Sequence, residues 1–81
     1  MVDVDYSRKF MKDVSKLDKQ YKQKVRKQTE KIIYNPLVGK PLRYTRKNTR
    51  EVYIKPFRLV YIYSIKDDKI TFLSVYHKDK Q

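Results

Sequence analysis

Phe-Arg-Leu-Val-Tyr-Ile-Tyr-Ser-Ile, residues 57–65, is a nearly continuous run of aromatic and β-branched residues. Such a run is typical of a central β-strand with both faces partly covered. The polar segment Lys-Asp-Asp-Lys at 66–69 predicts a hairpin turn, and the apolar segment 70–77 predicts the returning strand. This hairpin is the centre of the predicted fold, and the other elements are placed around it.

A further strand and a connector are predicted before this hairpin. Residues 51–55 place Val52 and Ile54 on one side, the alternation of a half-buried strand. Pro56 then interrupts the pattern, as prolines do at turns and sheet edges. Segment 35–42 holds two of the three prolines and the only glycine, which predicts an ordered connector.

The N-terminal part combines a short strand with a helical region. Residues 2–6 alternate apolar and acidic side chains, which predicts a strand, and Ser7 suits a helix N-cap. Over residues 8–34 apolar positions recur at three- and four-residue steps, which predicts helix until Pro36 ends it. A break near residues 17–20 would make a helical hairpin. No glycine or proline marks that break, so one bent helix is the alternative.

These elements predict an α+β fold with the order β-α-α-β-β-β, in a single domain covering residues 1–81. The N-terminal helical hairpin is expected to pack on one face of a mainly antiparallel sheet, which gives two layers. The sheet face away from the helices is then the natural place for an exposed functional site.

The composition limits the possible partners and cofactors. The chain has 21 Lys and Arg against 9 Asp and Glu, and its net charge of +12 favours a polyanionic partner. It has no cysteine and one histidine, which excludes a disulfide framework and a Cys/His zinc site; we expect no metal and no cofactor. The 40% of hydrophobic residues predicts a folded domain, and the uncharged runs are too short to span a membrane. We expect a soluble cytoplasmic protein.

Two segments carry most of the excess charge. Residues 19–31 have a net charge of +5, and lysines at many angles around a helix usually form a solvated face. Residues 40–58 have a net charge of +6 and more Arg, whose planar fork can bind phosphate bidentately. Arg58 lies inside an apolar strand, so its charge requires a partner. The two alternatives are an ion pair with Glu51 and a basic site that binds phosphate. The charge predicts RNA or DNA binding, with these candidates: Lys40, Arg43, Arg46, Lys47, Arg50 and Lys55.

Three motifs resemble those of RelE-type toxins from bacterial and archaeal toxin–antitoxin pairs. Phe-Arg-Leu-Val-Tyr at 57–61 resembles the family's Tyr-Arg-Leu-Val-Tyr strand. Asn-Pro at 35–36 and Gly-Lys-Pro-Leu at 39–42 are similar to the family's connector. Leu-Ser-Val-Tyr-His-Lys at 73–78 resembles its last strand. Together with the order of elements, these motifs are fairly specific for the RelE/ParE superfamily.

The resemblance implies a metal-independent, ribosome-dependent endoribonuclease that cleaves mRNA in the ribosomal A site. In this reaction a ribose 2′-hydroxyl attacks the adjacent phosphate, which requires a base, cations and an acid for the leaving oxygen. Arg58 matches the family's strand arginine, and Lys78 falls where the family has a C-terminal arginine. His77 falls where many relatives place a histidine, although a strand-end histidine satisfied by backbone or solvent is the alternative. Glu51 is a candidate base, as an acidic residue is in some relatives.

The proton donor is the role with the least support from the motifs. Several ribonuclease members have a catalytic tyrosine beyond the last strand, where this chain has Asp-Lys-Gln at 79–81. The acid role therefore falls to His77 or to a sheet tyrosine such as Tyr53 or Tyr76.

The resemblance also implies partners and leaves alternatives. The expected partners are a cognate RelB-like antitoxin, in a toxin–antitoxin hetero-oligomer, and the ribosome with its mRNA, with no membrane. One alternative is a ParE-like toxin that inhibits DNA gyrase without nuclease activity. The other is a basic RNA-binding module without catalysis.

Overall fold

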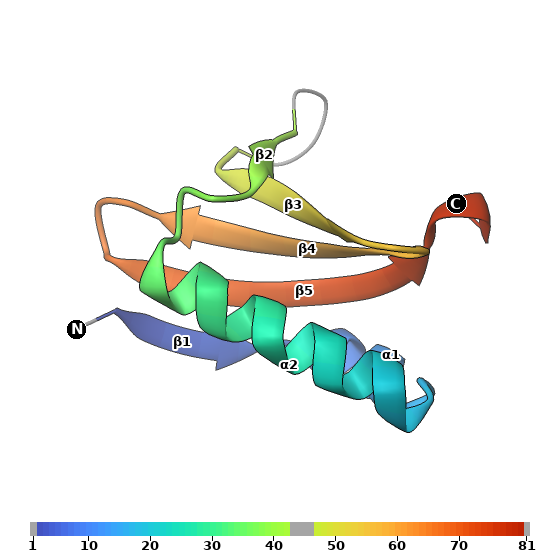
Figure 1. Cartoon of the computed structure of the whole chain (residues 1–81). Helices are drawn as coiled ribbons and strands as arrows, with labels where there is room; N and C mark the ends of the chain where they lie inside the picture. Colours follow the sequence, from blue (N-terminus) through green and yellow to red (C-terminus); the bar gives the residue numbers. More distant parts are fainter. Residues whose placement is uncertain (1, 43–46, 81) are drawn as a thin grey trace.

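The computed structural model describes residues 2–42 and 47–80, and it places two helices on one face of a five-stranded sheet (Figure 1). The elements in chain order are β1 (Asp3–Tyr6), α1 (Arg8–Ser15), α2 (Lys19–Tyr34), β2 (Lys40–Pro41), β3 (Thr49–Ile54), β4 (Phe57–Ser64), β5 (Lys69–His77) and a short 3₁₀ helix, η1 (Lys78–Lys80). The α+β class and the two-layer arrangement predicted from the sequence are confirmed.

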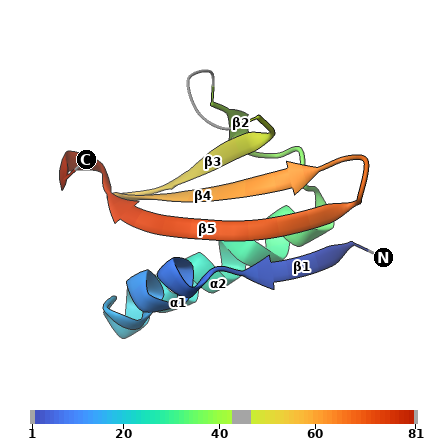
Figure 2. The same cartoon turned by 180° about the vertical axis from the view of Figure 1, so that it is seen from behind.

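The strands lie in the order β1-β5-β4-β3-β2. The β1–β5 pairing is parallel, and the pairings of β5 with β4, β4 with β3, and β3 with β2 are antiparallel. Seen from behind, β4 and β5 lie in front of α2, so this side shows the sheet face without helices (Figure 2). The sequence did not predict β2, because two residues are too few to show an alternating pattern.

The helical region is a hairpin rather than one bent helix. α1 ends at Ser15 and α2 begins at Lys19. Between them Asp18, the N-cap of α2, has an extended backbone with φ −64° and ψ 156°. One extended residue is enough to interrupt the helix, and this explains why neither glycine nor proline is needed at the break.

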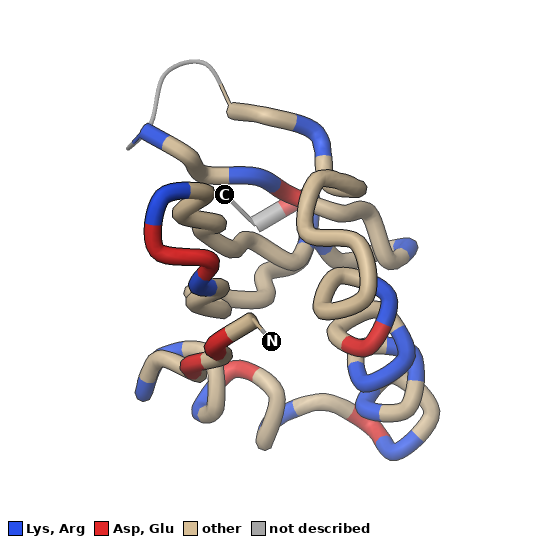
Figure 3. The backbone as a smooth tube through the Cα atoms, turned by 90° about the vertical axis from the view of Figure 1, so that its left-hand side faces the viewer, with Lys and Arg blue, Asp and Glu red and all other residues tan. Residues whose placement is uncertain are grey.

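The second helix separates an apolar side from a basic side. α2 buries Val25, Thr29 and Ile32, whereas each Lys and Arg of residues 19–31 is exposed. Figure 3 shows Lys and Arg recurring along the backbone, with fewer Asp and Glu between them. The basic segment on this helix is therefore a solvated face. In the described ranges, neither helix is long and apolar enough to span a membrane.

The hydrophobic core lies between the helices and the central strands. The ring centroids of Phe10 from α1 and Phe72 from β5 lie 5.4 Å apart, and Tyr61 from β4 lies 6.1 Å from Phe72. The buried apolar residues of the core are Phe10, Val25, Ile32, Ile54, Leu59, Tyr61, Ile70, Phe72 and Val75.

A β-bulge in β5 shifts its register against β4. Val60 is paired with Ser74. The next residue of β4, Tyr61, is paired with Phe72, so Leu73 is an extra residue in β5. A bulge of one residue exchanges the sheet faces to which the following side chains point. The bulge therefore decides which β5 side chains share a face with Arg58.

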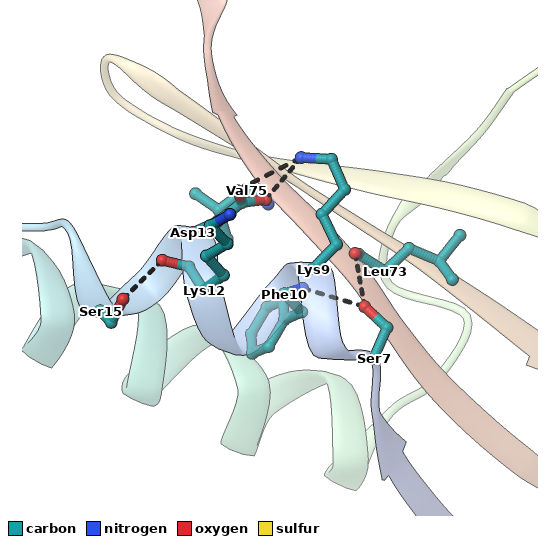
Figure 4. A network of polar contacts seen from close by, with 8 residues as sticks. All are labelled: Ser7, Lys9, Phe10, Lys12, Asp13, Ser15, Leu73 and Val75. Atoms are coloured by element: carbon teal, nitrogen blue, oxygen red, sulfur yellow. Dashed lines mark hydrogen bonds and ion pairs between the residues drawn. The ribbon is translucent and has the colours of Figure 1, made fainter.

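Polar contacts fix α1 to β5 at this bulge and two residues beyond it (Figure 4). The Ser7 hydroxyl accepts from the Phe10 backbone nitrogen at 2.9 Å and donates to the Leu73 carbonyl at 2.7 Å. Asp13 accepts a hydrogen bond from the Val75 backbone nitrogen at 3.0 Å. Ser7 is thus both the predicted N-cap of α1 and an anchor for the bulge.

Candidate functional site

Paired residues of three strands form a cluster on the open sheet face. Tyr53 of β3 is paired with Arg58 of β4, which is paired in turn with Tyr76 of β5. Directly paired residues project to the same face of a sheet. Because Leu59 is buried in the core, its neighbour Arg58 projects away from the helices. The Arg58 cluster, as we name it, consists of Glu51, Tyr53, Arg58, Tyr76 and Lys78.

Arg58 forms an ion pair with Glu51 through its Nη1 atom and the carboxylate Oε1. The two side chains are 30% and 11% exposed, so the pair is partly shielded from water. The Tyr76 hydroxyl donates to the other carboxylate oxygen of Glu51 at 3.2 Å. The ion pair that the sequence left as an alternative to a phosphate site is therefore present, and it lies within the same cluster.

The Tyr53 ring has two cations of the cluster beside it, Arg58 and Lys78. The guanidinium carbon of Arg58 lies 5.9 Å from the Tyr53 ring centroid, and the Lys78 Nζ lies 5.7 Å from it. Both distances are within the range of cation–π attraction. The backbone nitrogen of Lys78 donates to the Pro56 carbonyl at 3.0 Å, which fixes the beginning of η1 beside the β3–β4 turn. The two cations predicted for the site are thus brought to one half-exposed tyrosine ring.

The Arg58 guanidinium keeps one donor that no protein group accepts. Within the described part of the chain, its Nε is the one buried side-chain nitrogen or oxygen without a hydrogen-bond partner. An unsatisfied buried donor is costly in free energy. The guanidinium is therefore only partly satisfied by Glu51.

Tyr76 is held as a protonated phenol. Burial raises the pKa of Tyr76 above its ordinary value of 10.0, and the charge and hydrogen bond of Glu51 raise it further, while Arg58 opposes the shift. The hydroxyl therefore carries its proton at neutral pH. Both tyrosines named by the sequence as substitutes are paired with Arg58, but the Tyr76 hydroxyl is bonded to Glu51 and its side chain is less exposed than that of Tyr53.

His77 lies on the other face of the sheet. It is paired with Phe57, and their rings are 5.4 Å apart. The Phe57 ring lies in turn 5.1 Å from Tyr21 of α2, which places this contact on the helical side. The His77 Nδ1 accepts from the Asp79 backbone nitrogen at 3.2 Å. This corresponds to the strand-end histidine satisfied by backbone, and the structure does not bring His77 into the Arg58 cluster.

Arg50 supports the connector between α2 and β2. Its Nη1 donates to the carbonyl of Gly39 at 2.7 Å and to that of Leu37 at 3.2 Å. The guanidinium of this predicted RNA-binding residue is therefore already engaged by backbone carbonyls.

The other predicted RNA-binding residues are mainly exposed lysines. Lys40, Lys47 and Lys55 are exposed, whereas Arg43 and Arg46 lie outside the described residues. Lys55 contributes to a groove of about 250 Å³, where the basic segments of α2 and of the sheet adjoin. The groove is lined by Lys24, Lys27, Gln28, Lys31, Ile54 and Lys55.

The Arg58 cluster combines the side chains needed to handle a phosphate. Its two cations can attract a phosphate, Glu51 can accept a proton, and the Tyr76 phenol can donate one. Among the described residues, no group of three or more His, Cys, Asp or Glu is placed to hold a metal ion.

A comparison with protein-family models relates almost the whole chain to toxins. The model of the ParE toxin of the type II toxin–antitoxin system parDE matches residues 4–81. No curated protein sequence matches the chain.

Solved structures share this fold. The isolated RelE toxin of E. coli superposes with a TM-score of 0.83 at 14% identity, over 100% of this chain and 88% of that one. The toxin–antitoxin complex RelBE2 of Mycobacterium tuberculosis contains a chain with a TM-score of 0.79 at 26% identity, over 94% and 96% of the two chains. YafQ of E. coli strain BL21(DE3) has a TM-score of 0.78 at 23% identity, over 98% and 96%.

Proposed function

We propose that this chain, which belongs to the ParE toxin family of type II toxin–antitoxin systems within the RelE/ParE superfamily, is a ribosome-dependent endoribonuclease that cleaves mRNA in the A site. The observation that carries this proposal is the Arg58 cluster. Arg58 and Lys78 lie beside the same half-exposed tyrosine ring, on the sheet face that the helices leave open. The fold similarity to the RelE toxin supports the same reading.

Each step of the proposed reaction has a side chain in the cluster. Arg58 and Lys78 bind the scissile phosphate and stabilise the additional negative charge of the phosphorane. Glu51 accepts the proton of the 2′-hydroxyl as that oxygen bonds to phosphorus, and Tyr76 protonates the leaving 5′-oxygen. The products are a 2′,3′-cyclic phosphate and a 5′-hydroxyl. These four side chains supply every role, so the proposal includes neither metal nor cofactor.

The proposed partners follow from charge and from the relatives. The net charge of +12 supports docking on ribosomal RNA, which would be sensitive to salt because phosphate contacts release counterions. The RelBE2 relative comes from a toxin–antitoxin complex, which supports an antitoxin as the second partner. We propose that this partner is RelB-like, forms a hetero-oligomer with the toxin and neutralises it in the cytoplasm.

A ParE-like toxin without nuclease activity is the second candidate. The observation in its favour is that the matching family model is that of the ParE toxin. In this case the protein would inhibit DNA gyrase, and Arg58 would contribute to stability through Glu51 rather than to catalysis.

Primer extension on mRNA in a translating extract tests the proposal. Cleavage confined to ribosome-bound message is expected for the wild type and is expected to be lost in Arg58→Ala. The matched control is Arg26→Ala, which removes the same charge from an 82% exposed side chain of α2. Inhibition of gyrase supercoiling without cleavage would favour the second candidate, and RNA binding without either activity would favour a non-catalytic module.

A further inference from the structure

Glu51 occupies two anion-binding groups of the cluster, Arg58 and the Tyr76 hydroxyl, in the protein alone. Its Oε1 is ion-paired with the Arg58 Nη1, and its Oε2 accepts from the Tyr76 hydroxyl. A carboxylate and a phosphate present similar anionic oxygens to a guanidinium. The carboxylate therefore occupies, through one N–H group, the guanidinium to which a phosphate of RNA would bind.

The position of Glu51 in the sheet makes this pairing an intrinsic part of the fold. Glu51 is paired with Val60, and Arg58 lies two residues before Val60 on the same strand. Diagonal neighbours at this separation are within reach of long side chains on one sheet face. The Glu51 side chain is only 11% exposed, so water offers its charge little alternative to Arg58.

We propose that Glu51 is an internal competitor for Arg58, which RNA phosphate must displace before the guanidinium can bind it. This inference rests on the proposed function and concerns the regulation of the same site. In the wild type, Arg58 contributes little to the affinity for RNA, because one anion is exchanged for another. Once the carboxylate loses its charge, Arg58 becomes an additional phosphate contact.

The unsatisfied Nε of Arg58 supports this exchange. Glu51 engages Nη1, while the buried Nε donates to no acceptor. A planar guanidinium can bind a phosphate through two parallel N–H groups. An anion that used this second donor would satisfy the guanidinium more fully than the observed pair does.

The test measures the affinity for a short single-stranded RNA with 2′-O-methyl groups, which cannot be cleaved by 2′-hydroxyl attack. Glu51→Gln keeps the shape of the side chain and removes its charge. Its matched control is Glu30→Gln, which removes the same charge from a 67% exposed side chain paired with Arg26. Fluorescence anisotropy over a series of salt concentrations gives both the affinity and the number of phosphate contacts.

We expect Glu51→Gln to tighten binding about tenfold, the typical effect of one charge-assisted contact. The slope of the logarithm of the binding constant against the logarithm of the salt concentration should also become steeper by about 0.7, the increment for one phosphate of a single strand. Glu30→Gln should change affinity less and leave the slope unaltered. In an Arg58→Ala background, Glu51→Gln and Glu30→Gln should change the RNA affinity and its salt dependence by the same amounts. Equal effects of both variants in the Arg58-containing protein would overturn the inference.

Inorganic phosphate separates this inference from the proposed function. Titration followed through the NMR signal of the Arg58 Nε–H should show binding at lower phosphate concentration in Glu51→Gln than in the wild type. If neither protein binds RNA, the proposed function fails, and the phosphate titration still decides the inference. Glu51→Thr, which favours a strand, provides the same comparison if Glu51→Gln does not fold.

Discussion

The Tyr61 hydroxyl lies 2.9 Å from the backbone nitrogen of Gly39, which donates to it, and the same hydroxyl donates to the Pro36 carbonyl at 2.8 Å. Tyr61 is completely buried in β4, so the connector after α2 is fastened to the central strand. A β-carbon at Gly39 would lie 2.5 Å from the hydroxyl oxygen. The glycine in this connector is therefore explained by close packing against the tyrosine.

Replacing Tyr61 with phenylalanine should destabilise the protein. The change keeps the ring in the core but leaves the Gly39 nitrogen and the Pro36 carbonyl without their partner, which should cost about 1–3 kcal/mol in the free energy of unfolding. Urea denaturation measures this loss. The control is Tyr63→Phe, because that hydroxyl bonds Asp68 at an exposed site and should matter much less. Equal shifts of the two midpoints would contradict the role assigned to Tyr61.

Stability should also fall in alkaline solution. Burial raises the pKa of Tyr61 above its ordinary value of 10.0, although the Gly39 hydrogen bond and Arg50 oppose the shift. The folded protein therefore keeps this proton when the unfolded chain has lost it. The resulting contribution is fully present below pH 10.0 and is lost as the pH rises through the folded-state pKa.

Urea midpoints measured from neutral pH to above the ordinary tyrosine pKa test this expectation. The alkaline loss of stability should be smaller in Tyr61→Phe than in the wild type. Tyr76, whose pKa is also raised, should account for part of the remaining loss. An identical pH profile for wild type and Tyr61→Phe would show that the Tyr61 proton is not linked to folding.

The position of His77 shows where sequence reasoning reached its limit. The β4–β5 hairpin was predictable from composition, and its turn-proximal register pairs Ser64 with Lys69 and Tyr61 with Phe72. Extending that register without a bulge would pair Arg58 with Val75 and place His77 on the face of Arg58. The extra residue at Leu73 reverses these faces, and nothing in the local pattern of apolar residues indicates it.

Other parts of the prediction depended on signals of different strength. The Arg58–Glu51 pair was foreseeable, because each residue is a charge within a strand pattern and the strands are neighbours. The sequence did not decide between a helical hairpin and one bent helix, because an extended aspartate, Asp18, stands where a glycine or proline would have marked the break. The parallel pairing of β1 with β5 was not specified, because alternation within a strand does not reveal its partner.

A substitution at His77 should leave cleavage largely intact if the Arg58 cluster is the active site. His77→Gln alters a side chain on the helical face, so its effect should come mainly from weaker packing on Phe57. Arg58→Ala should reduce the cleavage rate at least about a hundredfold, the scale expected for removing a group that stabilises transition-state charge. Primer extension on ribosome-bound mRNA compares the two variants directly. A comparable loss in His77→Gln would move the active site to the other face.

Arg50 and Lys40 should respond differently to loss of charge. Arg50→Gln removes hydrogen bonds to two connector carbonyls and should lower the free energy of unfolding by about 1 kcal/mol. Lys40→Gln changes an exposed side chain and should leave stability unaltered. If Lys40 contacts phosphate, the loss of its charge should reduce the slope of the logarithm of the RNA-binding constant against the logarithm of the salt concentration by about 0.7. Denaturation and anisotropy titrations on both variants separate the two effects, and the opposite assignment would contradict the geometry.

The parallel pairing of β1 with β5 has a consequence for biosynthesis. Ser7 and Leu73, which bond across this junction, are 66 residues apart in the chain. β1 is synthesised early and its partner β5 late, so the backbone groups of β1 cannot pair with β5 until the intervening residues have been translated. Tyr76 and Lys78 are added after Leu73, and they complete the cluster beside Arg58. A nascent chain therefore completes the Arg58 cluster only when the sheet is nearly whole, and a chain that ends before Tyr76 lacks it.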